Sequence, residues 1–149
     1  MSSTPDAEPD FVGLAFGALA FSASLGLALN AAVGLAVRTL QTAEQAAQRL
    51  EMGAPTAVVL FAGTFLACFA AAIATWRVMA PARNTFRQGM LAMVSFFASF
   101  VLSVVTMPVD RAFGRLGLGV LCLGALGLAL LLGRKIGRIG VPASGNRPA

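Results

Sequence analysis

A chain of 149 residues that is 58% hydrophobic and 11% charged lacks the charged surface that a soluble domain of this length needs. The net charge of +5 does not indicate nucleic-acid binding, because most basic residues lie at the ends of apolar stretches, where they anchor helices to lipid headgroups. The sequence has no histidine, which removes the usual axial ligand of haem and the commonest proton carrier near neutral pH.

Four long stretches without Asp, Glu, Lys or His dominate the sequence, and only Arg115 places a charge inside one of them. Each supplies about 17–25 apolar residues, enough to cross a hydrocarbon core about 30 Å thick. We therefore expect an all-α integral membrane protein, an antiparallel bundle of four transmembrane helices within a single domain at residues 11–139. The expected spans are residues 11–37, 56–76, 89–109 and 112–132.

The N-terminal end combines a polar tail with a first span that is rich in small residues. Residues 1–10 predict a flexible tail, since they are polar and carry two prolines. In span 1 the small residues share one helix face, which predicts a close helix–helix contact within this chain or with another. Asn30, deep in this span, is expected to bond to a neighbouring helix. The small face comprises Gly13, Gly17, Ala20, Ser24, Ala28 and Ala31.

The connection at residues 38–54 is the only sizeable polar segment between spans. Thr42-Ala-Glu-Gln45 matches a capping box, and the apolar residues that follow lie on one face. We predict a short amphipathic helix between spans 1 and 2, either at the membrane interface or continuing span 1 out of the membrane. Gly53 and Pro55 are expected to end it.

Span 2 has two opposed faces of different size. Aromatic rings occupy one arc and small residues the other, which predicts that the rings point out of the bundle. The rings meet either lipid or a partner helix or apolar ligand such as a quinone, carotenoid or chlorin. The ring face is Phe61, Phe65, Phe69 and Trp76, and the opposite face is Gly63, Ala67, Ala70 and Ala74.

Spans 3 and 4 are expected to form a hairpin. Thr85-Phe-Arg-Gln88 matches a second capping box at the start of span 3, and a tight turn is expected around Pro108, Asp110 and Arg111. Ser95, Ser99, Ser103 and Thr106 share an arc of span 3, which indicates either interhelical packing or a lined pore. Span 4 carries Gly117, Gly124 and Gly127 on one arc, predicting another close contact. Residues 140–149 predict a disordered tail.

An even number of spans places both termini on one side of the membrane. Termini in the cytoplasm give the cytoplasmic segments seven basic residues, whereas the opposite orientation gives them four. The positive-inside rule then favours cytoplasmic termini, although span 1 alone prefers the reverse. We expect a multi-pass protein of the bacterial inner membrane. The seven residues are Arg77, Arg83, Arg87, Arg134, Lys135, Arg138 and Arg147.

The sequence offers no set of residues suited to catalysis or metal binding. No carboxylate lies within a span, and Cys68 and Cys122 fit no metal or redox motif. We therefore expect a non-catalytic accessory or assembly subunit of a respiratory or photosynthetic complex. Its expected partners are other membrane subunits and lipid, with no cofactor held by its own ligands. The alternatives are a homo-oligomeric channel or transporter lined by Ser95, Ser99 and Ser103, or a membrane enzyme acting on an apolar substrate.

Overall fold

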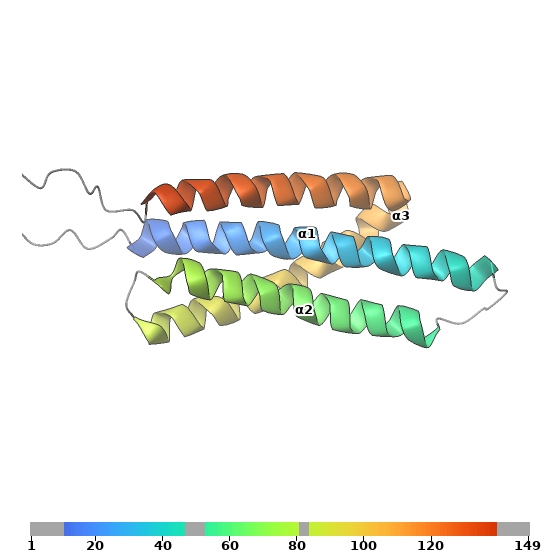
Figure 1. Ribbon diagram of the computed structural model, residues 1–149, viewed down its shortest axis with the longest axis horizontal. Helices are drawn as coiled ribbons and strands as arrows, with labels where there is room; N and C mark the ends of the chain where they lie inside the picture. The colour runs from blue at the N-terminus through green and yellow to red at the C-terminus, as the bar shows by residue number, and fades with distance from the viewer. Residues whose placement is uncertain (1–10, 47–52, 81–83, 140–149) are drawn as a thin grey trace, which may run out of the picture.

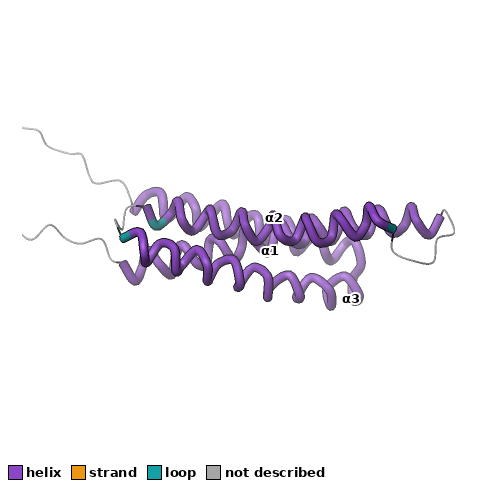
Figure 2. The backbone as a smooth tube through the Cα atoms, turned by 90° about the horizontal axis from the view of Figure 1, so that it is seen from below, coloured by secondary structure: helices purple, strands orange, loops and turns teal. Residues whose placement is uncertain are grey.

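The computed structural model describes residues 11–46, 53–80 and 84–139, and the predicted tails at residues 1–10 and 140–149 lie outside them. The described chain forms three helices: α1 (Phe11–Ala46), α2 (Ala54–Val78) and α3 (Thr85–Ile139). All three are long and apolar enough to cross a membrane. They run along one long axis, as Figures 1 and 2 show. The protein is thus an all-helical membrane protein.

Helix α1 continues through the segment in which a separate helix was expected to begin. Thr42 Oγ1 donates to the carbonyl of Arg38 at 2.8 Å, one turn back within α1, so Thr42 does not cap a new helix. The capping-box prediction at Thr42 is therefore wrong. Of the two arrangements expected for this segment, α1 shows the continuation of span 1, as far as Ala46. The remainder of the predicted amphipathic segment, residues 47–52, lies outside the described residues.

Helix α2 begins directly after Gly53, whose extended backbone (φ −69°, ψ 157°) precedes the first turn. Pro55 lies in that first turn, where its missing N–H costs nothing because the first amides of a helix have no partner within it. The other end of α2 is tied to α3, because Gln88 Nε2 donates to the carbonyl of Met79 at 3.0 Å. Gln88 and Met79 are both buried.

Asn84 caps the start of α3, one residue before the predicted cap. Asn84 Oδ1 accepts a hydrogen bond of 3.1 Å from the backbone N–H of Arg87. Gln88, expected to reach back and complete a capping box, instead reaches across to the end of α2. The predicted capping box at Thr85 is therefore wrong, although α3 does begin there. Asparagine takes the cap because its side-chain oxygen reaches the free amides of the first turn.

Helix α3 contains both segments that were expected as separate spans 3 and 4, so the predicted count of four helices is wrong. Its 55 residues are interrupted at Gly114, whose backbone (φ 59°, ψ −142°) is not helical and suits glycine alone. The expected turn near Pro108 is absent, and Pro108 lies inside the helix. We call residues 85–113 the first arm of α3 and residues 115–139 its second arm.

The two arms of α3 run in opposite directions along α1. The first arm runs parallel to α1, since Ser22 contacts Ser95 and, further along, Arg38 contacts Asp110. The second arm runs antiparallel to α1, because a Cβ on Gly34 would lie 3.3 Å from Leu118 and one on Gly17 would lie 3.4 Å from Ile136. Consequently the beginning of α1 and the end of α3 lie at the same end of the bundle (Figure 1).

The packing is that of a protein surrounded by lipid, with small residues inside and large apolar residues outside. The buried apolar residues are mostly alanines, of which Ala18, Ala31 and Ala71 have no exposed surface. The buried polar residues are mainly serines and threonines. Small side chains let helix backbones approach closely, which is how membrane helices gain contact energy without a hydrophobic contrast to lipid. Large apolar side chains cover the exterior of all three helices.

Candidate functional site

Three buried hydroxyl groups, one from each helix, join α1, α2 and α3. Ser22 Oγ of α1 donates to Ser95 Oγ of α3 at 3.0 Å, and Ser95 Oγ lies 2.6 Å from Thr75 Oγ1 of α2. At most 1% of each residue is exposed. Each hydroxyl has a partner, and hydrogen bonds of this kind between membrane helices contribute about 0.6 kcal/mol on average. This cluster holds the bundle together and offers no free group for chemistry.

One turn further along, α1 and the first arm of α3 lie in close contact at Gly26 and Ser99. A Cβ on Gly26 would overlap the Ser99 hydroxyl group and lie 2.9 Å from Ser99 Cβ. Only glycine fits there, because a methyl group would need the space that Ser99 occupies. The Ser99 hydroxyl is fully buried and has no hydrogen-bond partner within the described part of the chain. This crossing fixes how far apart the helices lie on either side of it.

Asn30 lies beside this crossing and is 3% exposed. Its Nδ2 donates to the carbonyl of Gly26 at 2.8 Å and to that of Ser99 at 3.4 Å. The sequence-based expectation that Asn30 bonds to a neighbouring helix is thus confirmed by the contact with Ser99. Its Oδ1 is buried and has no hydrogen-bond partner among the residues that the structure describes. A buried acceptor without a donor costs about 1–3 kcal/mol, and the buried Ser99 hydroxyl beside it is in the same position.

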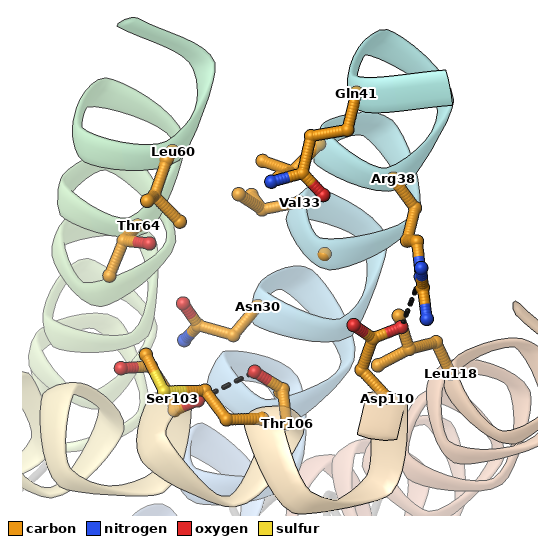
Figure 3. A pocket seen from close by; sticks show the side chains of 13 residues that line it. Asn30, Val33, Arg38, Gln41, Leu60, Thr64, Ser103, Thr106, Asp110 and Leu118 are labelled. Carbon is orange, nitrogen blue, oxygen red and sulfur yellow. Dashed lines mark hydrogen bonds and ion pairs between the residues drawn. The ribbon is translucent and has the colours of Figure 1, made fainter. Parts of the chain in front are cut away.

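A cavity of about 230 Å³ opens between the helices next to Asn30 (Figure 3). Apolar side chains from all three helices form much of its wall, among them Val33, Leu60 and Leu118. The polar residues along it are Asn30, Arg38, Gln41, Thr64, Ser103, Thr106 and Asp110. Figure 3 shows Asn30 and Thr64 facing each other across the space, with the Arg38–Asp110 pair at its side.

The charged groups of this cavity are paired with each other. Arg38 Nε lies 2.8 Å from Asp110 Oδ1, and the two side chains are 41% and 30% exposed. A partly exposed pair of this kind contributes at most about 1 kcal/mol. Arg115 of the second arm donates to Thr42 Oγ1 at 2.7 Å nearby. These contacts link α1 to both arms of α3 on either side of Gly114.

The aromatic residues predicted to point outward are placed on the surface of α2. Phe61, Phe65, Phe69 and Trp76 are between 42% and 73% exposed, whereas Ala67 on the opposite side is buried. Phe65 and Phe69 stack with ring centroids 6.3 Å apart, and Phe65 meets Phe96 of α3 edge to face at 5.7 Å. We call the four α2 residues the aromatic face. It continues onto the first arm of α3 through Phe96, which also contacts Phe97.

Only some of the small residues predicted to mark close helix contacts do so. Gly17 lies against Ile136, and Gly117 lies in the corner of the Gly114 turn against Phe113. Ser24 is buried, and its hydroxyl donates to Ala20 of its own helix at 2.9 Å. Gly13 and Gly124 are exposed, and a Cβ on Gly124 would have no neighbour within 4 Å among the described residues. The span 4 arc, with Gly124 and Gly127, therefore makes no close contact within the described chain.

The serine arc of α3 is divided between the helix interface and the cavity. Ser95 and Ser99 have at most 1% exposed surface and pack against α1 and α2. Ser103 and Thr106 line the cavity, but both hydroxyls donate to carbonyls of their own helix at 2.6 Å. Two of the three serines proposed to line a channel thus lie inside one copy of the chain.

The cysteines and acidic residues form no chemical centre in the described part of the chain. Cys68 is buried and Cys122 half-buried, and both are free thiols. Within residues 11–46, 53–80 and 84–139, no group of three His, Cys, Asp or Glu residues could hold a metal ion.

One face of α1 that packs against the other helices was not predicted from the sequence. This face has a small or polar residue at every fourth position. Ser22 bonds to Ser95, and Gly26 and Gly34 pack against Ser99 and Leu118. Asn30, between the two glycines, has a buried amide oxygen. Small or polar residues at this spacing signal a packed face in a membrane helix. The predicted stripe through Gly13, Gly17 and Ser24 runs along a neighbouring face.

No protein-family model matches this chain, and no curated protein or solved structure shows significant similarity to it.

Proposed function

We propose that this protein is a non-catalytic accessory or assembly subunit of a larger complex in the bacterial inner membrane, respiratory or photosynthetic. Its partners would be other integral membrane subunits and the surrounding lipid. The aromatic face supports this proposal best, because four large rings remain exposed on one helix while its opposite side is packed. Aromatic side chains provide large, rigid contact areas, which favours their use in helix contacts and against flat apolar cofactors.

We further propose that the chain crosses the membrane four times, with α3 crossing twice. The apolar part of α3 has 52 residues, which would extend about 78 Å if straight, far more than a hydrocarbon core of about 30 Å. The reversal at Gly114 divides the whole of α3 into two arms of roughly 43 and 37 Å, each long enough for one crossing. Tilted helices of this length fit a bilayer.

The proposed orientation places both ends of the chain in the cytoplasm. The bundle end at which α1 begins and α3 ends also carries Arg77, Arg87, Arg134 and Lys135. Arg38, Arg111 and Arg115 lie towards the opposite end. Cytoplasmic segments carry the larger share of basic residues, so the first of these ends is assigned to the cytoplasm.

The accessory role is preferred over a channel because of where the polar groups lie. Ser95 and Ser99 are committed to contacts within one chain, so a ring of copies could not present them to a common pore. An enzyme would need reactive groups, and the ionised groups that line the cavity form an ion pair with each other.

The test of the accessory role is recovery of partner subunits with and without the aromatic face. A tagged chain would be purified from native membranes in a mild detergent, and co-purifying proteins would be quantified by mass spectrometry. The variant replaces Phe61, Phe65 and Phe69 by leucine, which preserves membrane insertion because leucine and phenylalanine insert equally well. Each lost ring contact weakens association by about 0.5–1.5 kcal/mol.

The matched control replaces three rings of α1 and α3 by leucine, namely Phe16, Phe86 and Phe113. These rings are 72–76% exposed, against 51–73% for the three rings of the aromatic face. We expect recovery of a discrete set of membrane proteins to fall about tenfold or more in the first variant, since 1.4 kcal/mol corresponds to a factor of ten. The control should retain them. Equal recovery with both variants would mean that the aromatic face only meets lipid, and the proposal would fail.

A further inference from the structure

We infer that the reversal of α3 at Gly114 is a binding site for an anionic phospholipid. One acyl chain lies in an apolar groove that both arms line, and the phosphate lies beside Arg111 and Arg115. The inference goes beyond the proposed accessory role and does not depend on it. It rests on the proposed double crossing of α3, which places the reversal at one surface of the membrane.

The groove is formed by residues on both sides of Gly114, and every one of them is apolar or glycine. Its volume is about 480 Å³, within the range of roughly 300–1,000 Å³ that is usual for ligand sites. Phe113, Leu116 and Val120 are exposed, so the groove opens to the surroundings of the chain and not to the bundle interior. The lining residues are Val109, Phe113, Leu116, Gly117, Val120 and Leu121.

The reversal lies at the level where α1 changes from apolar to polar. Arg115 beside it donates to Thr42 Oγ1 at 2.7 Å, and residues 38–42 of α1 read Arg-Thr-Leu-Gln-Thr after the apolar run at residues 31–37. From this level both arms lead back towards the middle of the bundle. Val109 lies about 7.5 Å before Gly114 along the helix axis and Leu121 about 10 Å beyond it. The groove is therefore at the depth of acyl chains, just below the headgroups.

Two exposed arginines at the headgroup end of the groove determine the charge of the lipid. Among the described side chains, neither Arg111 nor Arg115 has an acidic partner, because Asp110 is paired with Arg38. Arg115 gives one N–H to Thr42 and keeps the other donors of its guanidinium group. Guanidinium groups bind phosphate oxygens in pairs, and two uncompensated positive charges favour a headgroup with a net negative charge.

The experiment measures lipid binding to the full-length protein by native mass spectrometry. The protein in mild detergent would be titrated with dioleoyl phosphatidylglycerol, which is anionic, and separately with dioleoyl phosphatidylcholine, which has the same chains and no net charge. The dissociation constant of the tightest-bound lipid follows from the fraction of protein that carries one lipid. A competition series adds glycerol 1-phosphate, which offers the phosphate without acyl chains.

We expect phosphatidylglycerol to bind about tenfold or more tightly than phosphatidylcholine, since each basic residue at a membrane surface favours anionic lipid by about fivefold. Arg111→Gln combined with Arg115→Gln should abolish this preference. Arg111→Gln alone breaks no contact within the described chain and should reduce it about fivefold, which provides a second test if the double variant folds poorly. The matched control, Arg134→Gln with Lys135→Gln, removes the same charge from the other end of the second arm and should keep the preference.

The groove itself is tested by removing one of its walls. Phe113→Ala should weaken the binding of both lipids roughly two- to tenfold, the factor that corresponds to one lost ring contact. The control Phe16→Ala removes a ring of α1 with the same exposed fraction, 72%, that does not line the groove. This control should leave both affinities unchanged.

Equal affinity of the wild-type protein for the two lipids would overturn the inference. So would an equal loss of preference in the Arg134 and Lys135 control, because the lipid would then be attracted by any exposed cation. Displacement of phosphatidylglycerol by glycerol 1-phosphate would show a phosphate site without a place for the chain, which also contradicts the inference. The number of membrane crossings is measured by side-specific labelling and not by lipid titration, so failure of one proposal is distinguishable from failure of the other.

Discussion

Replacing Gly26 by alanine would disturb the contact between α1 and the first arm of α3. The added methyl group would overlap the Ser99 hydroxyl and lie 2.9 Å from Ser99 Cβ, whereas carbon atoms pack best at about 3.5–4.0 Å. Rotation of the serine can move its hydroxyl away but leaves Cβ in place. The two helices must therefore separate by about 1 Å, the difference between these distances.

This separation would lengthen the neighbouring hydrogen bonds between α1 and the first arm of α3. The Asn30–Ser99 hydrogen bond is already 3.4 Å long and would be lost, and the Ser22–Ser95 bond of 3.0 Å would be stretched. Overpacking of this kind costs about 1–3 kcal/mol. We expect Gly26→Ala to lower the free energy of unfolding by that amount, measured by titrating the purified protein from mild detergent into sodium dodecyl sulfate.

The matched control is Gly119→Ala on the second arm, where a Cβ would have no neighbour within 4 Å among the described residues. Alanine favours a helix over glycine by up to about 1 kcal/mol, so this variant should be neutral or more stable. The double variant Gly26→Ala, Ser99→Gly removes the obstructing atoms and should recover most of the loss. If Gly26→Ala is as stable as Gly119→Ala, the helices do not meet at Gly26 and the packing described above is wrong.

Three further substitutions test the reversal of α3 and the cap at its start. Gly114→Ala should cost about 1–3 kcal/mol in the same unfolding titration, because its backbone conformation strains any residue with a Cβ even where space is open; a stability equal to wild type would argue against the reversal at that residue. Asn84→Ala should lower the free energy of unfolding by about 0.5–2 kcal/mol, because the hydrogen bond to the Arg87 amide is lost. Thr85→Ala should lower it by less. If Thr85→Ala is the more damaging of the two, Thr85 is the cap.

The class of fold followed from the sequence because it depends on where charges are absent. Long stretches without ionised groups can only be long apolar helices at these lengths, whatever their packing. The helix boundaries near Gly53 and Thr85 followed from local turn signals. The reversal of α3 was misplaced because Pro108 and Asp110 resemble a turn in sequence, whereas Pro108 is accommodated within the helix and the left-handed residue is Gly114.

The contact surface of α1 could not be chosen from periodicity alone. Alanine, glycine and serine occur around the whole circumference of this helix, so several faces meet the small-residue criterion. The structure uses the face through Ser22, Gly26 and Asn30, because α1 packs against α2 and both arms of α3 (Figure 1). The cavity is less predictable still. Its lining residues come from all three helices, so its position depends on side chains that are distant in the sequence.

Labelling of single cysteines tests directly whether α3 crosses the membrane twice. In a chain with Cys68 and Cys122 replaced by alanine, cysteine would be introduced separately at Arg87, Arg111 and Arg134, all exposed. An impermeant maleimide applied to one side of sealed vesicles should label positions 87 and 134 together, and position 111 only from the other side. Labelling of positions 87 and 134 from opposite sides would show that α3 crosses the membrane once and would contradict the account.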